Sequence, residues 1–361
     1  MTFFTDLRNF LVRERIWTLL FLLLLGFYAL NSLLMRKTPE QPPQAPSQAM
    51  EQLRQAEEEL KREIQAAGGM QEFLSRNPKL LLIFNAFSVF LITIFVFGVF
   101  LDLAWWMRPG WRQGLAITEG APEARHWGIG TVFKVSILFV LLALGLGFLL
   151  SILKSKFFPW LSPNLLALAH TTISDFLCIG LAAFFVVRLG GHWTEFGFKG
   201  VKFWRDLKVG LIGYVAILPV FLLALAIVIM VAYLFSYEPP PHPLVEIFLE
   251  EEKRSPAIVA YSIFLGTVAG PLFEEIFFRG FCYPAFKKRW GIFWAMVLSA
   301  ALFALIHQNT FAFGPIFVLG VGLAYLYEKR GTLVPSIALH IVHNSIFIAY
   351  FFLAKEVLVR S

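Results

Sequence analysis

Residues 274–280 read Glu-Glu-Ile-Phe-Phe-Arg-Gly and place two acids and an arginine inside an apolar stretch of the chain. The surrounding residues, 257–286, are otherwise nearly all apolar or small. A charged side chain at the centre of a bilayer costs about 2.5–3.5 kcal/mol on insertion scales, so ionisable residues inside membrane helices are rare and usually functional. The stretch therefore predicts a membrane helix whose charged residues find partners on other helices.

The composition of the whole chain is that of a membrane protein. Of its 361 residues, 58% are hydrophobic, 15% are charged and 40 are phenylalanine, and this apolar share is well above that of soluble domains. The formal net charge of +7 comes mostly from basic residues in short segments between apolar runs. These basic residues are therefore expected to orient the helices in the membrane. The net charge does not predict a nucleic-acid partner. Cys178 and Cys282 have no metal-ligand spacing.

Nine apolar runs are long enough to cross a hydrocarbon core about 30 Å thick as helices. They are residues 16–35, 80–106, 131–153, 164–187, 209–236, 257–284, 291–311, 313–328 and 333–354. The run 313–328 is short and closely follows its neighbour, so a count of eight stays open. The predicted fold is all-α, a polytopic bundle of about eight or nine transmembrane helices in a lipid bilayer.

The runs and the segments between them divide the chain into four predicted parts. Residues 1–35 form an N-terminal membrane anchor, and residues 36–79 form a soluble insert. Residues 80–187 form accessory transmembrane helices, and residues 188–354 form the transmembrane domain that carries the candidate site. The insert begins with a proline-rich stretch, which is expected to be extended. Residues 48–66 then form a charged helix that is expected to be solvated. An interfacial helix or a short coiled coil is the alternative.

Lysine and arginine are unevenly distributed between the loops, and this bias predicts orientation. With a cytoplasmic N-terminus, the inner loops hold Arg108, Arg112, Arg125, Arg188, Lys199, Lys202, Arg205, Lys208, Lys287, Lys288, Arg289, Lys329 and Arg330. The outer loops hold Lys154, Lys156, Lys253 and Arg254. No small-residue cleavage site follows the first run, so we expect it to stay as an anchor. The expectation is an integral protein of a bacterial inner membrane with its N-terminus in the cytoplasm.

Polar residues on three apolar runs are candidates for one site. Residues four apart share a helix face, so Glu275 and Arg279 can form an ion pair, while Glu274 is turned about 100° away. The alternative is a Glu–Arg pair that only locks two helices together, but it leaves Glu274 without a partner. His307 lies one turn after Phe303 on the next run.

The last run carries His340, His343 and Asn344 at positions i, i+3 and i+4, so all three are predicted to share one face. Three polar groups on an apolar helix are not expected to face lipid. Their alternative role is to hydrogen-bond neighbouring helices. Together with the glutamates they suggest activation of water, with a carboxylate as base and with histidines that ligate a metal or hold an oxyanion. Zinc is one candidate, although the His-Glu-x-x-His motif is absent.

Three motifs, in order on separate apolar runs, resemble those of the CPBP family of intramembrane proteases, which includes type II CAAX prenyl endopeptidases and bacteriocin-processing and immunity proteins. The family pattern Glu-Glu-x-x-x-Arg, Phe-x-x-x-His and His-x-x-x-Asn/Asp is matched over about residues 190–350, so residues 188–354 are expected to be a CPBP-like catalytic domain. The matching residues are Glu274, Glu275, Arg279, Phe303, His307, His340 and Asn344. His343 lies outside the pattern.

The resemblance implies a role for each residue. Glu274 activates water, Glu275 assists it or pairs with Arg279, and Asn344 holds the oxyanion. His307 and His340 bind the water or, with Glu274, a zinc or other divalent ion. The implied substrate is a membrane-associated protein or peptide, cleaved near the cytoplasmic face, and no oligomeric state is implied.

Two other functions compete with an intramembrane endopeptidase. The first is a catalytically idle relative that serves as a membrane scaffold or immunity protein, which the complete set of motif residues disfavours. The second is an ion-coupled transporter, in which buried Glu, His and Arg act as relays. Matched half-chains and interrupted helices of the kind seen in transporters are not evident.

Overall fold

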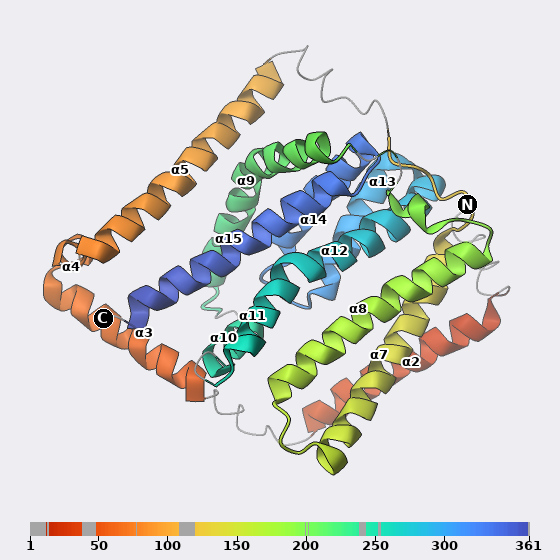
Figure 1. The fold of residues 1–361 in the computed structure, drawn as a ribbon, viewed down its shortest axis with the longest axis horizontal. Helices are drawn as coiled ribbons and strands as arrows, with labels where there is room; N and C mark the ends of the chain where they lie inside the picture. Colours follow the sequence, from red (N-terminus) through yellow and green to blue (C-terminus); the bar gives the residue numbers. More distant parts are fainter. Residues whose placement is uncertain are drawn as a thin grey trace. The chain divides into compact units, whose positions relative to one another are not determined.

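The computed structural model contains helices and no strand in the residues that it describes, which confirms the all-α prediction (Figure 1). Those residues are 12, 14–37, 48–76, 78–107, 120–198, 200, 202–237, 243–251 and 254–359. Several positions named above lie outside them: the proline-rich stretch of the insert, Arg108, Arg112, Lys199 and Lys253.

The chain divides into two compact units. The first contains Met1–Ser47 and Arg125–Gly191, and its helices are α2 (Arg15–Lys37), α7 (Ile129–Phe157) and α8 (Pro163–Arg188). Within it, Lys134 Nζ donates to Glu14 Oε1 over 2.8 Å. The second contains Gln48–Ala124 and His192–Ser361. The predicted division into four functional parts stays a prediction.

The second unit holds the remaining helices. They are α3 (Gln48–Ala67), α4 (Met70–Arg76), α5 (Pro78–Met107), η1 (Trp193–Phe196), α9 (Phe203–Leu234), α10 (Pro243–Glu251), α11 (Pro256–Phe264), η2 (Leu265–Ala269), α12 (Gly270–Glu275), η3 (Ile276–Cys282), α13 (Tyr283–Ile306), α14 (Phe313–Arg330) and α15 (Val334–Val359). The charged helix predicted at 48–66 corresponds to α3. It buries Leu60 and Ala67 against Phe73 and Leu74 of α4, so one side of it is packed.

Six helical segments of the described chain are long and apolar enough to cross a membrane, as expected of an integral membrane protein. They are Leu81–Met107, Ile129–Phe157, Pro163–Arg188, Phe203–Leu234, Pro256–Ile306 and Val334–Lys355. The segment Pro256–Ile306 covers the predicted run 257–284 and most of the run 291–311. A break in α13 lies at Gly291, the first residue of the second run, whose φ of 77° suits glycine. The predicted count of eight or nine spans is not confirmed and stays a prediction.

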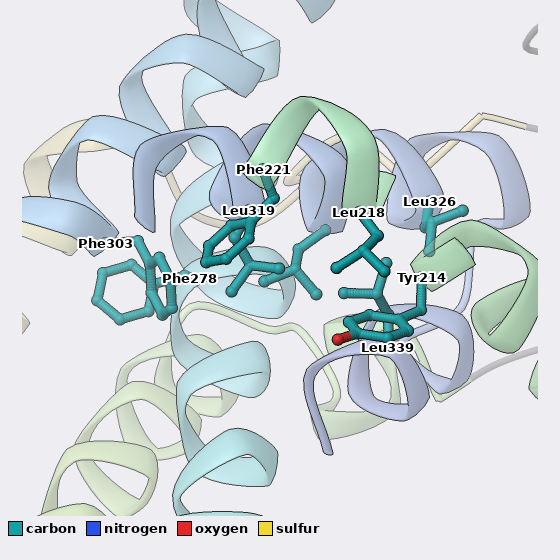
Figure 2. Packing of buried hydrophobic residues seen from close by; sticks show 9 residues of the cluster. Tyr214, Leu218, Phe221, Phe278, Phe303, Leu319, Leu326 and Leu339 are labelled. Carbon is teal, nitrogen blue, oxygen red and sulfur yellow. The ribbon is translucent and has the colours of Figure 1, made fainter. Parts of the chain in front are cut away.

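An apolar core holds five elements of the second unit together. On α9, Tyr214, Leu218 and Phe221 recur at helical spacing and therefore face one side of the helix. They meet α14 and α15, and the core extends to η3 and α13 (Figure 2). The other buried members are Phe278, Phe303, Leu319, Leu323, Leu326 and Leu339. Since Phe278 and Phe303 lie on the segments that carry two of the motifs, the core fixes these segments against one another.

Candidate active site

The helix that carries the two glutamates is locally widened on both sides of them. The short α-helical piece α12 ends at Glu275, and π-helical turns, η2 and η3, flank it. Each π-helical turn ends two residues before a proline, Pro271 in one case and Pro284 in the other. Proline has no N–H and its ring clashes with the carbonyl one turn earlier, which opens the helical hydrogen-bond ladder. Such π-bulges are frequent at functional sites.

Glu275 and Arg279 form the ion pair expected from their spacing. Arg279 Nη1 donates to Glu275 Oε1 over 2.9 Å, and both side chains are fully buried. Arg279 Nη2 also donates to the carbonyl of Gly320 on α14 over 3.0 Å. The guanidinium lies 4.6 Å from the centroid of the Phe303 ring, a cation–π distance. The arginine therefore joins three helical segments.

His340 lies between the two glutamates. Its Nδ1 is 3.0 Å from Glu275 Oε1, and its Nε2 is 3.6 Å from Glu274 Oε2. The His340 side chain is 3% exposed, whereas that of Glu274 is 30% exposed. Because Glu275 holds Nδ1, the opposite edge of the ring faces Glu274. Glu274 is thus separate from the Arg279 pair, as expected, but it faces an imidazole that the sequence could not assign to it.

His307 joins this group through Phe303. Its Nδ1 lies 2.7 Å from the carbonyl of Phe303, and because a carbonyl only accepts, we assign the proton to Nδ1. The Nε2 atom then remains as an acceptor. The Phe303 ring contacts His307 at a centroid distance of 4.8 Å and His340 at 5.5 Å. The three motifs therefore meet around the ring of Phe303.

Asn344 and His343 are directed to different neighbours. Asn344 Nδ2 donates to the carbonyl of Gly266 in η2 over 2.8 Å. His343 packs against Phe221 and Phe347, with ring centroids 4.7 and 4.8 Å apart. Its Nδ1 is buried without a hydrogen-bond partner among the described residues. The helix face predicted for all three polar residues of α15 is therefore shared between the site and the apolar core.

The described residues do not bring a complete set of ligands for a divalent ion together. In the described part of the chain, no group of three or more His, Cys, Asp or Glu side chains is arranged to hold a metal, whereas a catalytic zinc takes three protein ligands. Nδ1 of His307 and Nδ1 of His340 face protein oxygens, which leaves the two Nε2 atoms for a water or an ion. We therefore derive no step through a metal, and the ligand set His307, His340 and Glu274 stays a prediction.

Fold and site together define an integral membrane protein with a polar site built among its helices. Residues 256–346 match a family described as Rce1-like, Type II CAAX prenyl endopeptidase Rce1-like, so the chain contains a domain of this family. The match covers all six predicted site residues and confirms the resemblance noted from the motifs. The family supports a protease. No curated protein and no solved structure matches the chain.

Sequence reasoning missed residues that act through their backbone. Gly320 and Gly266 supply carbonyls to Arg279 and Asn344, and Pro271 stands at the end of a π-helical turn. The prolines inside the apolar run were a usable signal, because proline is costly inside a helix. The partners of the two carbonyls had no local signal, since they lie 41 and 78 residues away.

Proposed function

We propose that this protein is an intramembrane endopeptidase that hydrolyses a peptide bond near the cytoplasmic membrane face with a water activated by Glu and His. The observation that carries the proposal is the division between the two glutamates. Glu275 is fully buried and paired with Arg279, whereas Glu274 is 30% exposed and faces His340. A carboxylate that is accessible and lies outside the ion pair with the arginine suits a general base.

The proposed reaction needs one water and the side chains of the site. Glu274 takes a proton from the water while the water oxygen attacks the carbonyl carbon of the substrate. The Nε2 of His307 accepts a hydrogen bond from this water, and Asn344 donates its second N–H to the oxyanion. The tetrahedral intermediate collapses with cleavage of the C–N bond, and the proton on Glu274 passes to the leaving amine.

Glu275 and Arg279 support this chemistry without reacting. Glu275 fixes the His340 ring through Nδ1, and Arg279 balances the charge of Glu275. A carboxylate behind a histidine orients the ring in many enzymes. Metal assistance through His307, His340 and Glu274 is the alternative that the sequence leaves, and chelation distinguishes it from the water mechanism.

The proposed substrate is a membrane-associated protein or peptide that reaches the site from the cytoplasmic side. The uneven distribution of basic residues between the loops supports an N-terminus in the cytoplasm, and we propose the bacterial inner membrane as the location. The family name suggests a peptide with a prenylated C-terminal CAAX box as a first probe.

The test uses the full chain in lipid nanodiscs with two quenched fluorescent CAAX peptides, one farnesylated and one without the lipid. The wild type is expected to cleave at least one peptide, and Glu274→Gln to cleave neither at an equal protein level. An idle scaffold would cleave neither peptide in wild-type form. An ion-coupled transporter would move ions in proteoliposomes without producing peptide fragments.

A further inference from the structure

The π-helical turn before the glutamates has a carbonyl that its own helix does not satisfy. In an α-helix the carbonyl of Gly266 would accept from Gly270 N–H, but that N–H donates to Leu265 instead, five residues back. The next donor in a π-helix would be residue 271, which is proline and has no N–H. Gly266 is therefore left with neither of its helical donors.

Asn344 supplies the missing donor from another helix. Its Nδ2 lies 2.8 Å from the carbonyl of Gly266. In the interior of a membrane protein an unpaired backbone carbonyl is costly, and neighbouring helices commonly satisfy the groups that a proline frees. The bond thus follows from the position of Pro271, and it ties η2 to α15.

The bond joins the two helical segments that carry His340 and Glu274. Asn344 follows His340 by four residues on α15, and Gly266 precedes Glu274 by eight residues, about two helical turns, with Pro271 between them. A displacement of η2 relative to α15 would therefore change the separation of His340 and Glu274, now 3.6 Å. A Cβ on Gly266 would lie 2.9 Å from Leu244 Cδ1 of α10, the far end of a flexible side chain.

We propose that Pro271 and Gly266 are positioning residues of the proposed peptidase. Pro271 leaves the Gly266 carbonyl without a helical donor, and Asn344 donates a hydrogen bond to this carbonyl. This hydrogen bond, here called the tie, holds Glu274 beside His340. The proposal rests on the proposed function for its effect on cleavage. The tie itself, however, is a structural statement that can be measured without activity.

Pro271→Ala is the decisive variant, because it restores an N–H that can bond within the helix. We expect kcat on the farnesylated CAAX peptide to fall about tenfold to a hundredfold, as small displacements of reacting groups do, with little change in KM and no loss of thermal stability. Pro219→Ala is the matched control, since Pro219 also lies inside a helix, α9. It should leave kcat unchanged. Wild-type kcat in Pro271→Ala would overturn the proposal.

A double-mutant cycle tests the tie without reference to cleavage. Asn344→Ala should lower the Tm in the wild-type background and much less in the Pro271→Ala background, where Gly266 has a donor of its own. Equal losses of Tm in the two backgrounds would overturn the proposal. If the wild type cleaves neither peptide, the proposed function fails, and the cycle still decides whether the tie exists.

A second pair of variants serves if Pro271→Ala does not fold. Gly266→Val should push η2 away from α10 and lower kcat, because Leu244 can turn aside from a single methyl group more easily than from a stiff, branched side chain. Leu244→Ala in the same background should make room for the added side chain and restore kcat. A loss of kcat that Leu244→Ala does not relieve would contradict the positioning role.

Discussion

Two buried arginine–carboxylate pairs lie in the second unit, and they differ in how completely their polar atoms are bonded. In the pair of Arg330 with Asp206, Arg330 Nε and Nη2 both donate to Asp206 Oδ1, over 2.9 and 2.8 Å. The other carboxylate oxygen accepts from Lys202 N–H and Thr332 Oγ1. This pair joins the start of α9 to the end of α14, and both Asp206 oxygens are bonded.

The pair of Arg279 with Glu275 is less complete. Glu275 Oε2 and Arg279 Nε are buried without a hydrogen-bond partner among the described residues. A buried ion pair offsets its desolvation cost only when its remaining polar atoms are also hydrogen-bonded, whereas unsatisfied buried atoms lower stability and call for an explanation. The first pair joins two helices with both carboxylate oxygens bonded, whereas the second also bonds His340 through Glu275 Oε1 and leaves two of its own atoms unbonded among the described residues.

The largest expected effect is on the chemistry at Glu274. Glu274→Gln removes the proposed base and keeps the shape of the side chain, so cleavage should fall by about 10²–10⁴-fold, the usual contribution of general acid–base catalysis. The Tm in detergent should stay close to that of the wild type, because the side chain is partly exposed. Cleavage of the CAAX peptides at the wild-type rate by this variant would remove Glu274 from the mechanism.

The next largest effect distinguishes the variants of the two arginines by their kcat. Arg279→Ala and Arg330→Ala each leave a buried carboxylate unpaired, so each should lower the free energy of unfolding by about 3–5 kcal/mol. Only Arg279→Ala should also reduce kcat per folded molecule, since Arg279 bonds Glu275, which holds His340, whereas Arg330 bonds Asp206 at the start of α9. The comparison fails if chemical unfolding shows Arg279→Ala to be as stable as Glu274→Gln, or if both arginine variants lose kcat alike.

A smaller effect is expected from Thr332→Val, which removes one hydrogen bond to Asp206 and keeps the volume. A hydrogen bond to a charged group contributes about 1.5–3 kcal/mol, and the unfolding free energy should fall by this amount. The kcat should be unchanged, because we expect the pair of Arg330 with Asp206 to stabilise the fold and to take no part in cleavage. A loss of activity without a loss of stability would assign that pair to the site instead.

The smallest effect is expected from removal of metal. Because the described residues form no group of three suitable ligands, cleavage of the CAAX peptides should persist after exhaustive chelation. Elemental analysis of the active protein is the control. Stoichiometric zinc that is lost in both His307→Ala and His340→Ala, together with inactivation by chelators, would instead support the metal site expected from the sequence.

The sequence alone determined the features that depend on near neighbours along the chain. The long apolar runs predict membrane helices, and the spacing of Glu275 and Arg279 predicts their ion pair, because residues four apart share a helix face. The order of the three motifs was sufficient to predict the Rce1-like domain found at residues 256–346.

The tertiary structure alone decided which distant groups meet. His340 bridges the two glutamates, His343 turns to Phe221, and Asn344 bonds Gly266. The i, i+3, i+4 spacing on α15 could not separate these roles, because the rotation of a helix among its neighbours is set by packing. The π-helical turns had a local cause in Pro271 and Pro284, but their effect depends on a donor that only the folded chain brings to them.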